Sequence, residues 1–206
     1  EIVKTEKGDY VGFKTVIRGQ GTAEILNRVI PQVVGSLSFP KMMRWGTGQT
    51  RFSRPIRNVL AVFGGEPLSF EIAGLAAGTK TSGHMIRSPK PIEARSFAEY
   101  ETALKANMVT IDPDERKKVI LSQIDALLAS LGAALHPDPG LLDKLSSDVE
   151  CPFVFLGSFP EAYLSLPLEI LSTAMREGLK VFSVVKGKKQ LPVFLGIADA
   201  PSDAKA

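Results

Sequence analysis

A long helix with its own start and stop signals lies in the middle of the chain. Asp112 precedes Pro113, and Glu115 completes an Asp-x-x-Glu pattern that is typical of a helix N-terminus. Gly132 follows the last apolar position, as glycine often does at a helix C-terminus. The apolar positions follow helical spacing and are Ile120, Ile124, Leu127, Leu128 and Leu131. The pattern predicts one helix over residues 112–131, and we interpret its Arg116-Lys117-Lys118 triplet as a solvated face.

Strand patterns come mostly as neighbouring pairs that a short turn can join. Residues 59–63 and 68–72 flank a Gly-Gly turn, and the second segment alternates apolar and polar residues, as a strand with one buried face does. The expected hairpins are 1–18, 59–72 and 181–197, and further strands are expected within 74–83 and 153–156. The other expected helices are 22–37 (kinked or split at Pro31), 97–106, 139–149 and 168–177. We therefore predict an α+β fold with a mixed, mostly antiparallel sheet and flanking helices.

The length of 206 residues allows one generous domain or two small ones. We predict a single α/β module over residues 1–199, with an optional break into two subdomains near 90–112. Residues 200–206 are small, polar or charged, so we expect a disordered tail there. Glu1 is not an initiator residue, which indicates that the chain is a piece of a longer protein.

The composition excludes several classes of protein. Apolar residues make up 44% of the chain and charged residues 23%, as in an ordinary globular protein. No apolar run approaches the ~20 residues that a membrane-spanning helix needs, and no signal peptide opens the chain. The single cysteine, Cys151, cannot form an internal disulfide, which favours a reducing cytoplasm. We interpret Cys151 as a buried, inert thiol.

The net positive charge is concentrated between Phe39 and Arg57, a stretch with no acidic residue and with the chain's one tryptophan, Trp45. Its cations are Lys41, Arg44, Arg51, Arg54 and Arg57. Arginines interleaved with aromatic rings can neutralise phosphates and stack on bases, so this stretch is a candidate RNA contact. The residues favour equally a solvated basic loop whose Trp45 and Phe52 belong to the ordinary core.

Several short motifs occur in one order along nearly the whole chain. They are Met43-Arg44-Trp45-Gly46, Arg51-Phe52-x-Arg54-Pro55-Ile56, Gly83-His84, Leu166-Pro167-x-Glu169-x-Leu171 followed by Met175, and Leu191-Pro192-x-Phe194. In this order they resemble the β subunit of bacterial glycyl-tRNA synthetase, of the type built from two α and two β subunits. The chain departs from that pattern at Ser82, where arginine is usual, and at Asp199, where asparagine is usual. It also reads Gly-Leu-Lys-Val-Phe over residues 178–182, where the family reads His-Gln-Lys-Tyr-Phe.

The resemblance implies an internal module of an enzyme that joins glycine to tRNA(Gly) in the bacterial cytoplasm. The whole enzyme would use ATP and magnesium. This piece would carry neither site and no catalytic residue, because adenylation belongs to the α subunit in that family. The expected partners are the α subunit and tRNA(Gly), with no membrane and no DNA.

In such a module, the candidate RNA contacts of residues 39–57 would be made to tRNA: the cations would contact phosphates, and Trp45 would stack on a base or serve as a structural anchor. Arg44 and Arg51 flank the turn Gly46-Thr47-Gly48 and are best placed to reach a ligand. Arg54, which precedes Pro55, is the best candidate for an internal pair.

Two other functions stay open. In a scaffold or subunit-interface module, the same arginines would pair with carboxylates of another domain or subunit. The family's fold in this region resembles the editing-domain-like module of the phenylalanyl-tRNA synthetase β subunit, so hydrolytic editing is a further hypothesis. We rank editing last, because fold analogy does not confer chemistry and a tight pocket for glycine already excludes larger side chains.

Isolated residues elsewhere give weaker signals. Two histidines and one cysteine, far apart in the sequence, do not predict a metal site. No strained nucleophile turn surrounds Ser82 or Ser88, so we interpret His84 as a hydrogen-bonded structural histidine at a strand end. His136 is expected in an exposed loop.

Two further candidate sites are turns, one rich in glycine and one rich in lysine. Gly46-Thr47-Gly48 lacks the Lys-Ser/Thr that follows a phosphate-binding loop, so we interpret it as a simple turn. The predicted hairpin tip at residues 186–189 carries three lysines, which make either a solubilising turn or a phosphate contact.

Overall fold

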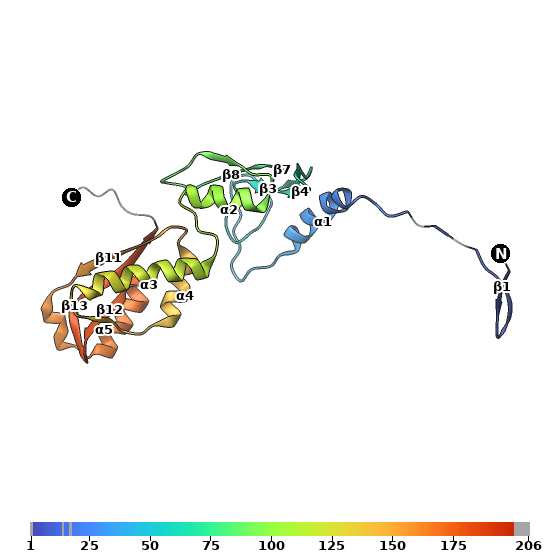
Figure 1. Ribbon diagram of the computed structural model, residues 1–206. Coiled ribbons are helices and arrows are strands. Elements are labelled where there is room, and N and C mark those ends of the chain that lie inside the picture. The colour runs from blue at the N-terminus through green and yellow to red at the C-terminus, as the bar shows by residue number, and fades with distance from the viewer. Residues whose placement is uncertain (1, 14, 17, 200–206) are drawn as a thin grey trace. The chain divides into compact units, whose positions relative to one another are not determined.

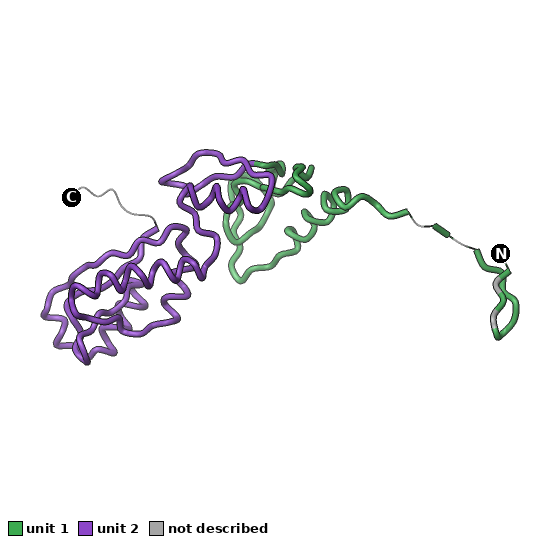
Figure 2. The backbone as a smooth tube through the Cα atoms, in the orientation of Figure 1, with its two compact units in different colours: residues 1–79 green, residues 80–206 purple. Residues whose placement is uncertain are grey.

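The structure, a computed structural model, describes residues 2–13, 15–16 and 18–199. The chain divides into two compact units, residues 1–79 (unit 1) and residues 80–206 (unit 2), which Figure 2 shows in different colours. The division precedes the segment 90–112, where the sequence analysis places its optional break. Residues 200–206, for which we predict a tail, lie outside the described part of the chain.

Unit 1 begins with a hairpin and a helix, both labelled in Figure 1. Strands β1 (Ile2–Thr5) and β2 (Gly8–Val11) pair antiparallel, as the sequence predicts, and Gly8 takes a φ of 125° at the turn. Helix α1 (Thr22–Ser36) continues through Pro31, so the segment is one helix and not two. None of the residues of α1 is buried.

Very short strands make up the rest of unit 1. They are β3 (Val59–Leu60), β4 (Val62–Phe63), β5 (Glu66–Pro67), β6 (Glu71–Ile72) and β7 (Leu75–Gly78). The predicted β4–β5 hairpin turns through Gly64 and Gly65, whose φ angles of 62° and 85° suit a two-residue turn. The predicted second arm, 68–72, is strand only at its end, where β6 pairs with β7. Its alternation is confirmed, because Leu68 is buried while Ser69 is exposed.

Unit 2 starts with the hairpin β8 (Lys80–Ser82) and β9 (Pro91–Glu93), followed by helix α2 (Phe97–Ala106). The predicted bounds of α2 are confirmed. Its N-terminus is capped by the Ser96 hydroxyl, which accepts from the Glu99 amide at 3.2 Å. A close turn follows β8, because a Cβ on Gly83 would lie 2.5 Å from the Asn107 Cβ.

The long predicted helix is α3 (Pro113–Ala129), and Asp112 caps it by accepting from the Asp114 amide at 2.8 Å. The remaining elements are β10 (Ala134–Leu135), α4 (Pro139–Asp148), β11 (Pro152–Ser158), a 3-10 helix (Glu161–Ser165), α5 (Leu168–Ala174) with a π-helical turn (Met175–Leu179), β12 (Phe182–Lys186) and β13 (Lys189–Asp199). Strand β10 and the 3-10 helix are additions to the sequence prediction, and both are too short to leave a periodic pattern.

One antiparallel sheet of strand order β10-β12-β13-β11 carries the core of unit 2. Helices α3 and α4 pack on the face that holds Phe182 and Val184. The core cluster is Ile120, Ile124, Leu128, Leu141, Leu145, Val154, Phe182, Val184 and Leu195. Ser183 points to the opposite face, since side chains alternate along a strand, and its hydroxyl lies 3.6 Å from the Met175 sulfur of the π-helical turn. The predicted α+β class with mostly antiparallel strands is therefore confirmed, with the strands shared among several sheets.

Two expectations about side chains in unit 2 are wrong. Arg116 is not part of a solvated face, because its guanidinium donates to the carbonyl oxygens of Thr110, Ile111 and Ser146. Ser146 lies in the last turn of α4, where carbonyl groups lack helical hydrogen-bond partners. Arg116 donates a hydrogen bond to one of these carbonyls, and the sequence pattern does not reveal this contact. His136 is not in an exposed loop either: it is half-buried, and its amide donates to the Ser183 carbonyl at 2.9 Å.

No helix among the described residues is both long enough and apolar enough to span a membrane.

Candidate nucleic-acid interface

The basic segment 39–57 follows α1 and leads into β3 within unit 1. Its two halves are tied together by a bridge in which the Met43 amide donates to the Phe52 carbonyl at 2.8 Å and the Phe52 amide donates to the Met43 carbonyl at 3.2 Å. The Phe39 ring meets the Phe52 ring edge-on, with centroids 4.9 Å apart. The bridge and the ring pair close residues 44–51 into a loop with a defined base.

All five cations of the segment are exposed. The Arg44 guanidinium donates to the Gln49 side-chain oxygen at 3.1 Å, which orients the arginine without neutralising it. Among residues 2–13, 15–16 and 18–199, no carboxylate lies within ion-pair distance of Lys41, Arg51 or Arg54. Arg54 is exposed in this chain, and its internal pair within the β subunit or with the α subunit stays a prediction.

The aromatic residues of the segment are only half-buried. The solvated-loop interpretation placed Trp45 and Phe52 in the ordinary core. Both have intermediate exposure, so neither belongs to the buried core. Trp45 precedes Gly46, whose φ of 55° gives the left-handed conformation that a turn requires. A half-exposed indole beside a turn is available to a partner, whereas a fully buried one is not.

The second basic cluster lies in unit 2, at the tip of the β12–β13 hairpin. Lys186, Lys188 and Lys189 are all exposed there, and Gly187 makes the turn with a φ of 62°. The predicted hairpin tip is confirmed. Its role as a solubilising turn or as a phosphate contact stays a prediction.

His84 lies directly after β8 and is 2% exposed. Its Nδ1 accepts from the Arg87 amide at 3.2 Å, and its own amide donates to the Asn107 carbonyl at 3.0 Å. The expected burial and hydrogen bonding at a strand end are therefore present. The Nε2 atom lies 3.2 Å from the Asp199 Oδ2 but has no well-directed hydrogen bond.

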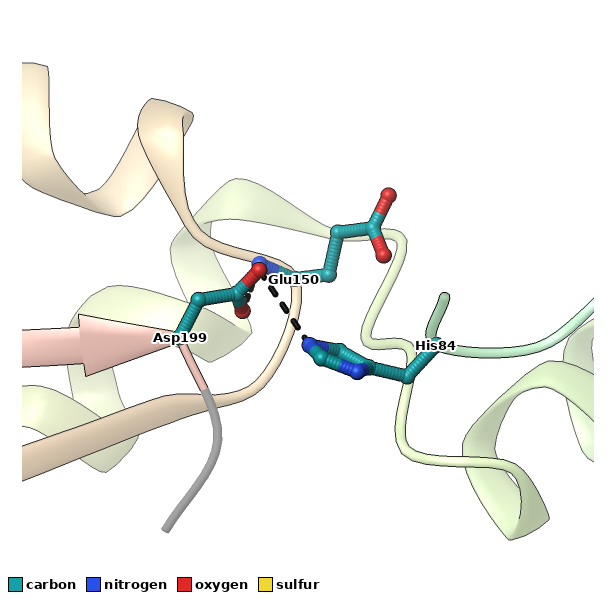
Figure 3. A group of neighbouring side chains, drawn as sticks. All are labelled: His84, Glu150 and Asp199. Atoms are coloured by element: carbon teal, nitrogen blue, oxygen red, sulfur yellow. Dashed lines mark hydrogen bonds and ion pairs between the residues drawn. The ribbon is translucent and has the colours of Figure 1, made fainter. Parts of the chain in front are cut away.

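The surroundings of Nε2 bring together residues that are distant in the sequence. Figure 3 shows His84 and Asp199 facing each other, with Glu150 beside them. One ligand-type atom from each of the three residues lies within 4.8 Å of the other two. From the sequence, Asp199 is visible only as a departure from a motif, and Glu150 gives no signal. No regular spacing relates His84, Glu150 and Asp199, because the fold brings them together.

Cys151, beside this cluster, is half-buried and not buried as expected. Burial raises the pKa of its thiol, and the negative charge of Asp199 raises the pKa further. Both effects disfavour the thiolate, which is the reactive form. The thiol is therefore a poor nucleophile at neutral pH, in agreement with its interpretation as inert.

Comparison with known proteins assigns the chain to a family. The family model described as glycyl-tRNA synthetase beta subunit matches residues 1–206. A glycine–tRNA ligase beta subunit from Syntrophotalea carbinolica is 33% identical over 97% of the chain, and the match covers 29% of that relative. The corresponding protein from Desulforudis audaxviator is 37% identical over 90% of the chain, which covers 27% of the relative. The chain thus spans less than a third of the length of these relatives, and it belongs to the glycyl-tRNA synthetase β-subunit family.

Proposed function

We propose that this chain is a module of a glycine–tRNA ligase β subunit and supports the ATP-dependent attachment of glycine to tRNA(Gly) in the cytoplasm. The family membership and the printed names of the relatives support this proposal. The α subunit of the same enzyme is the proposed protein partner. ATP and magnesium are used by the whole enzyme, and this chain supplies neither their binding site nor a catalytic residue.

The contribution of the module itself is contact with tRNA through residues 39–57. The observation that carries this proposal is the closed loop 44–51, which holds Arg44 and Arg51 exposed beside a half-exposed Trp45. A guanidinium fork matches two phosphate oxygens, and an indole face can stack on an unpaired base. Because the Met43–Phe52 bridge fixes the base of the loop, little backbone entropy is lost when the arginines bind.

The test measures tRNA(Gly) affinity of the assembled enzyme at several salt concentrations. Arg44→Ala and Arg51→Ala should each weaken binding and reduce the slope of log affinity against log salt by up to ~0.9 per lost phosphate contact. Arg28→Ala is the matched control, because Arg28 is also exposed and also donates to a glutamine oxygen at 3.1 Å, that of Gln20. The control should leave both affinity and slope unchanged.

Unchanged affinity and an unchanged slope for both Arg44→Ala and Arg51→Ala would contradict RNA contact. The scaffold or subunit-interface function would then take its place. One observation favours that second candidate: unit 1 leaves a row of apolar side chains exposed along α1, at Ile25, Val29 and Val33. Under the scaffold function, the arginine variants should lower assembly with the α subunit, because a carboxylate across the interface would lose its partner.

Hydrolytic editing remains the lowest-ranked alternative. It would require a catalytic constellation near His84 or Ser82. Purified enzyme should therefore not deacylate alanyl-tRNA above background. Hydrolysis that one substitution near His84 abolishes would replace the tRNA-contact proposal with editing.

A further inference from the structure

The cluster of His84, Glu150 and Asp199 has the composition of a transition-metal site. We propose that these three side chains bind one divalent zinc-class cation, which ties the loop after β8 to the start of β11 and the end of β13. The site lies wholly within unit 2 and is independent of the tRNA contact proposed for unit 1. One imidazole and two carboxylates are hard and borderline ligands that suit such an ion.

The Nε2 nitrogen of His84 is buried. It is inaccessible to solvent and makes no well-directed hydrogen bond among the described residues, although the Oδ2 atom of Asp199 lies 3.2 Å away. A buried polar atom whose nearest polar neighbour is poorly aligned calls for an explanation, and a bound ion between the two groups supplies one. Two ligands of an ion with bonds of 2.0–2.2 Å lie about 3.3 to 3.6 Å apart in tetrahedral geometry, close to the observed separation.

The carboxylate of Asp199 is held in place by backbone amides. Its Oδ1 accepts from the backbone amides of Glu150 at 2.8 Å and Cys151 at 2.9 Å. These bonds fix the carboxylate and leave Oδ2 directed at His84 (Figure 3). Hydrogen bonds of this kind orient a ligating carboxylate before the metal arrives.

The backbone of Glu150 is fixed, and the carboxylate side of the cluster is open to solvent. The Glu150 carbonyl accepts from the Thr110 amide at 2.9 Å, so the residue is fixed while its side chain is exposed. The side chain of Asp199 is 40% exposed, whereas that of His84 is 3% exposed. An ion can therefore approach from the carboxylate side and shed waters as it reaches the imidazole.

The protonation changes on binding follow from these contacts. The Arg87 amide donates to Nδ1, which places the proton of the neutral metal-free ring on Nε2. An ion bound at Nε2 would require the ring proton on Nδ1, so the 3.2 Å contact with the Arg87 amide would have to open. Loss of that contact is modest beside the affinity that three ligands provide.

The experiment titrates Zn²⁺ into the complete protein that contains this chain, after treatment with a chelator. Glu150→Gln keeps the size of an exposed side chain and should weaken Zn²⁺ binding about tenfold or more. Asp199→Asn keeps the oxygen that accepts from the two amides and should weaken binding further. Glu101→Gln, an exposed carboxylate on α2 outside the cluster, is the matched control and should bind as the wild type does.

A second measurement identifies the ligands directly. X-ray absorption of the zinc-loaded protein should show nitrogen and oxygen neighbours with one imidazole. When the spectrum of the Asp199→Asn variant is subtracted from that of the wild type, the difference should show no sulfur neighbour of zinc at about 2.3 Å. Equal Zn²⁺ affinity in the wild type, Glu150→Gln and Asp199→Asn would overturn the proposal, and so would a sulfur ligand that is lost with Asp199, since it would assign the ion to Cys151.

Discussion

The two units of this chain differ in how many apolar side chains they bury. Unit 2 contains a nine-residue buried cluster between one antiparallel sheet and two helices. In unit 1, Leu68 is the only fully buried apolar side chain among the described residues. Large apolar side chains that are exposed in unit 1 include Tyr10, Val11, Phe13, Ile25, Val29, Val33, Leu37, Met43 and Phe63.

The helix ends show the same difference. Three of the four α-helices of unit 2, α2, α3 and α4, are capped by a side chain, from Ser96, Asp112 and Asp138, whereas α5 is not. Helix α1 of unit 1 begins after Gly21 and has no side-chain cap. Burial and capping are the ordinary sources of stability in a small domain, so unit 2 has its own and unit 1 has few. Unit 1 thus exposes apolar side chains of the kind that a partner surface can cover.

The largest expected effect comes from removing a core ring. Phe182 is 1% exposed, and Phe182→Ala should lower the free energy of unfolding by about 3–5 kcal/mol. Phe63 of unit 1 is 48% exposed, and Phe63→Ala should cost less than about 0.5 kcal/mol. Urea unfolding followed by circular dichroism measures both. Equal losses for the two phenylalanines would show that unit 1 has a core of its own.

A pair of glycine substitutions should change stability in opposite directions. A Cβ on Gly83 would lie 2.8 Å from the Ser88 carbonyl oxygen and 2.9 Å from that of Asn107, so Gly83→Ala should destabilise the chain by about 1–3 kcal/mol. Gly35 lies in α1 with nothing within 4 Å of a new Cβ. Gly35→Ala should therefore stabilise by up to about 1 kcal/mol through helix propensity. Thermal denaturation distinguishes the signs, and destabilisation by Gly35→Ala would mean that another surface closes on this helix.

The smallest expected effects concern helix caps. Asp112→Ala removes the acceptor for the Asp114 amide and should cost about 1 kcal/mol. Gly21→Asp adds an acceptor to α1 and should gain about 0.3 kcal/mol, since glycine is only slightly worse than aspartate at this position. Denaturation midpoints at matched ionic strength measure both changes. A gain at Gly21 as large as the loss at Asp112 would indicate that α1 is limited by its cap and not by its missing partner surface.

Elements with complete local signals were predictable from the sequence. Helix α2 has its predicted bounds, and α3 has its predicted cap at Asp112. The β4–β5 and β12–β13 hairpins form around their predicted glycine turns. Each of these signals acts between residues a few positions apart, which is the range over which a sequence pattern can be read directly. The likeness of this region to the editing-domain-like module of phenylalanyl-tRNA synthetase stays a prediction.

The candidate RNA segment was partly predictable. Its cations and its tryptophan were visible as composition, and so was the turn at Gly46. The Met43–Phe52 bridge and the half-buried state of Trp45 were not, because they depend on pairing between the two ends of the loop. The functional contacts of Arg44 and Arg51 remain proposals that the salt titration tests.

The sequence by itself determined the family, the α+β class and the positions of the capped helices, because these rest on short motifs and local periodicity. Only the tertiary structure decided which distant groups meet. It brought the Arg116 guanidinium to the Ser146 carbonyl, and it placed Asp199 against His84. Contacts of this kind arise when a sheet and its helices close around a core, and the residues involved have no common spacing in the chain. Their partners are therefore fixed by packing, which a local pattern does not encode.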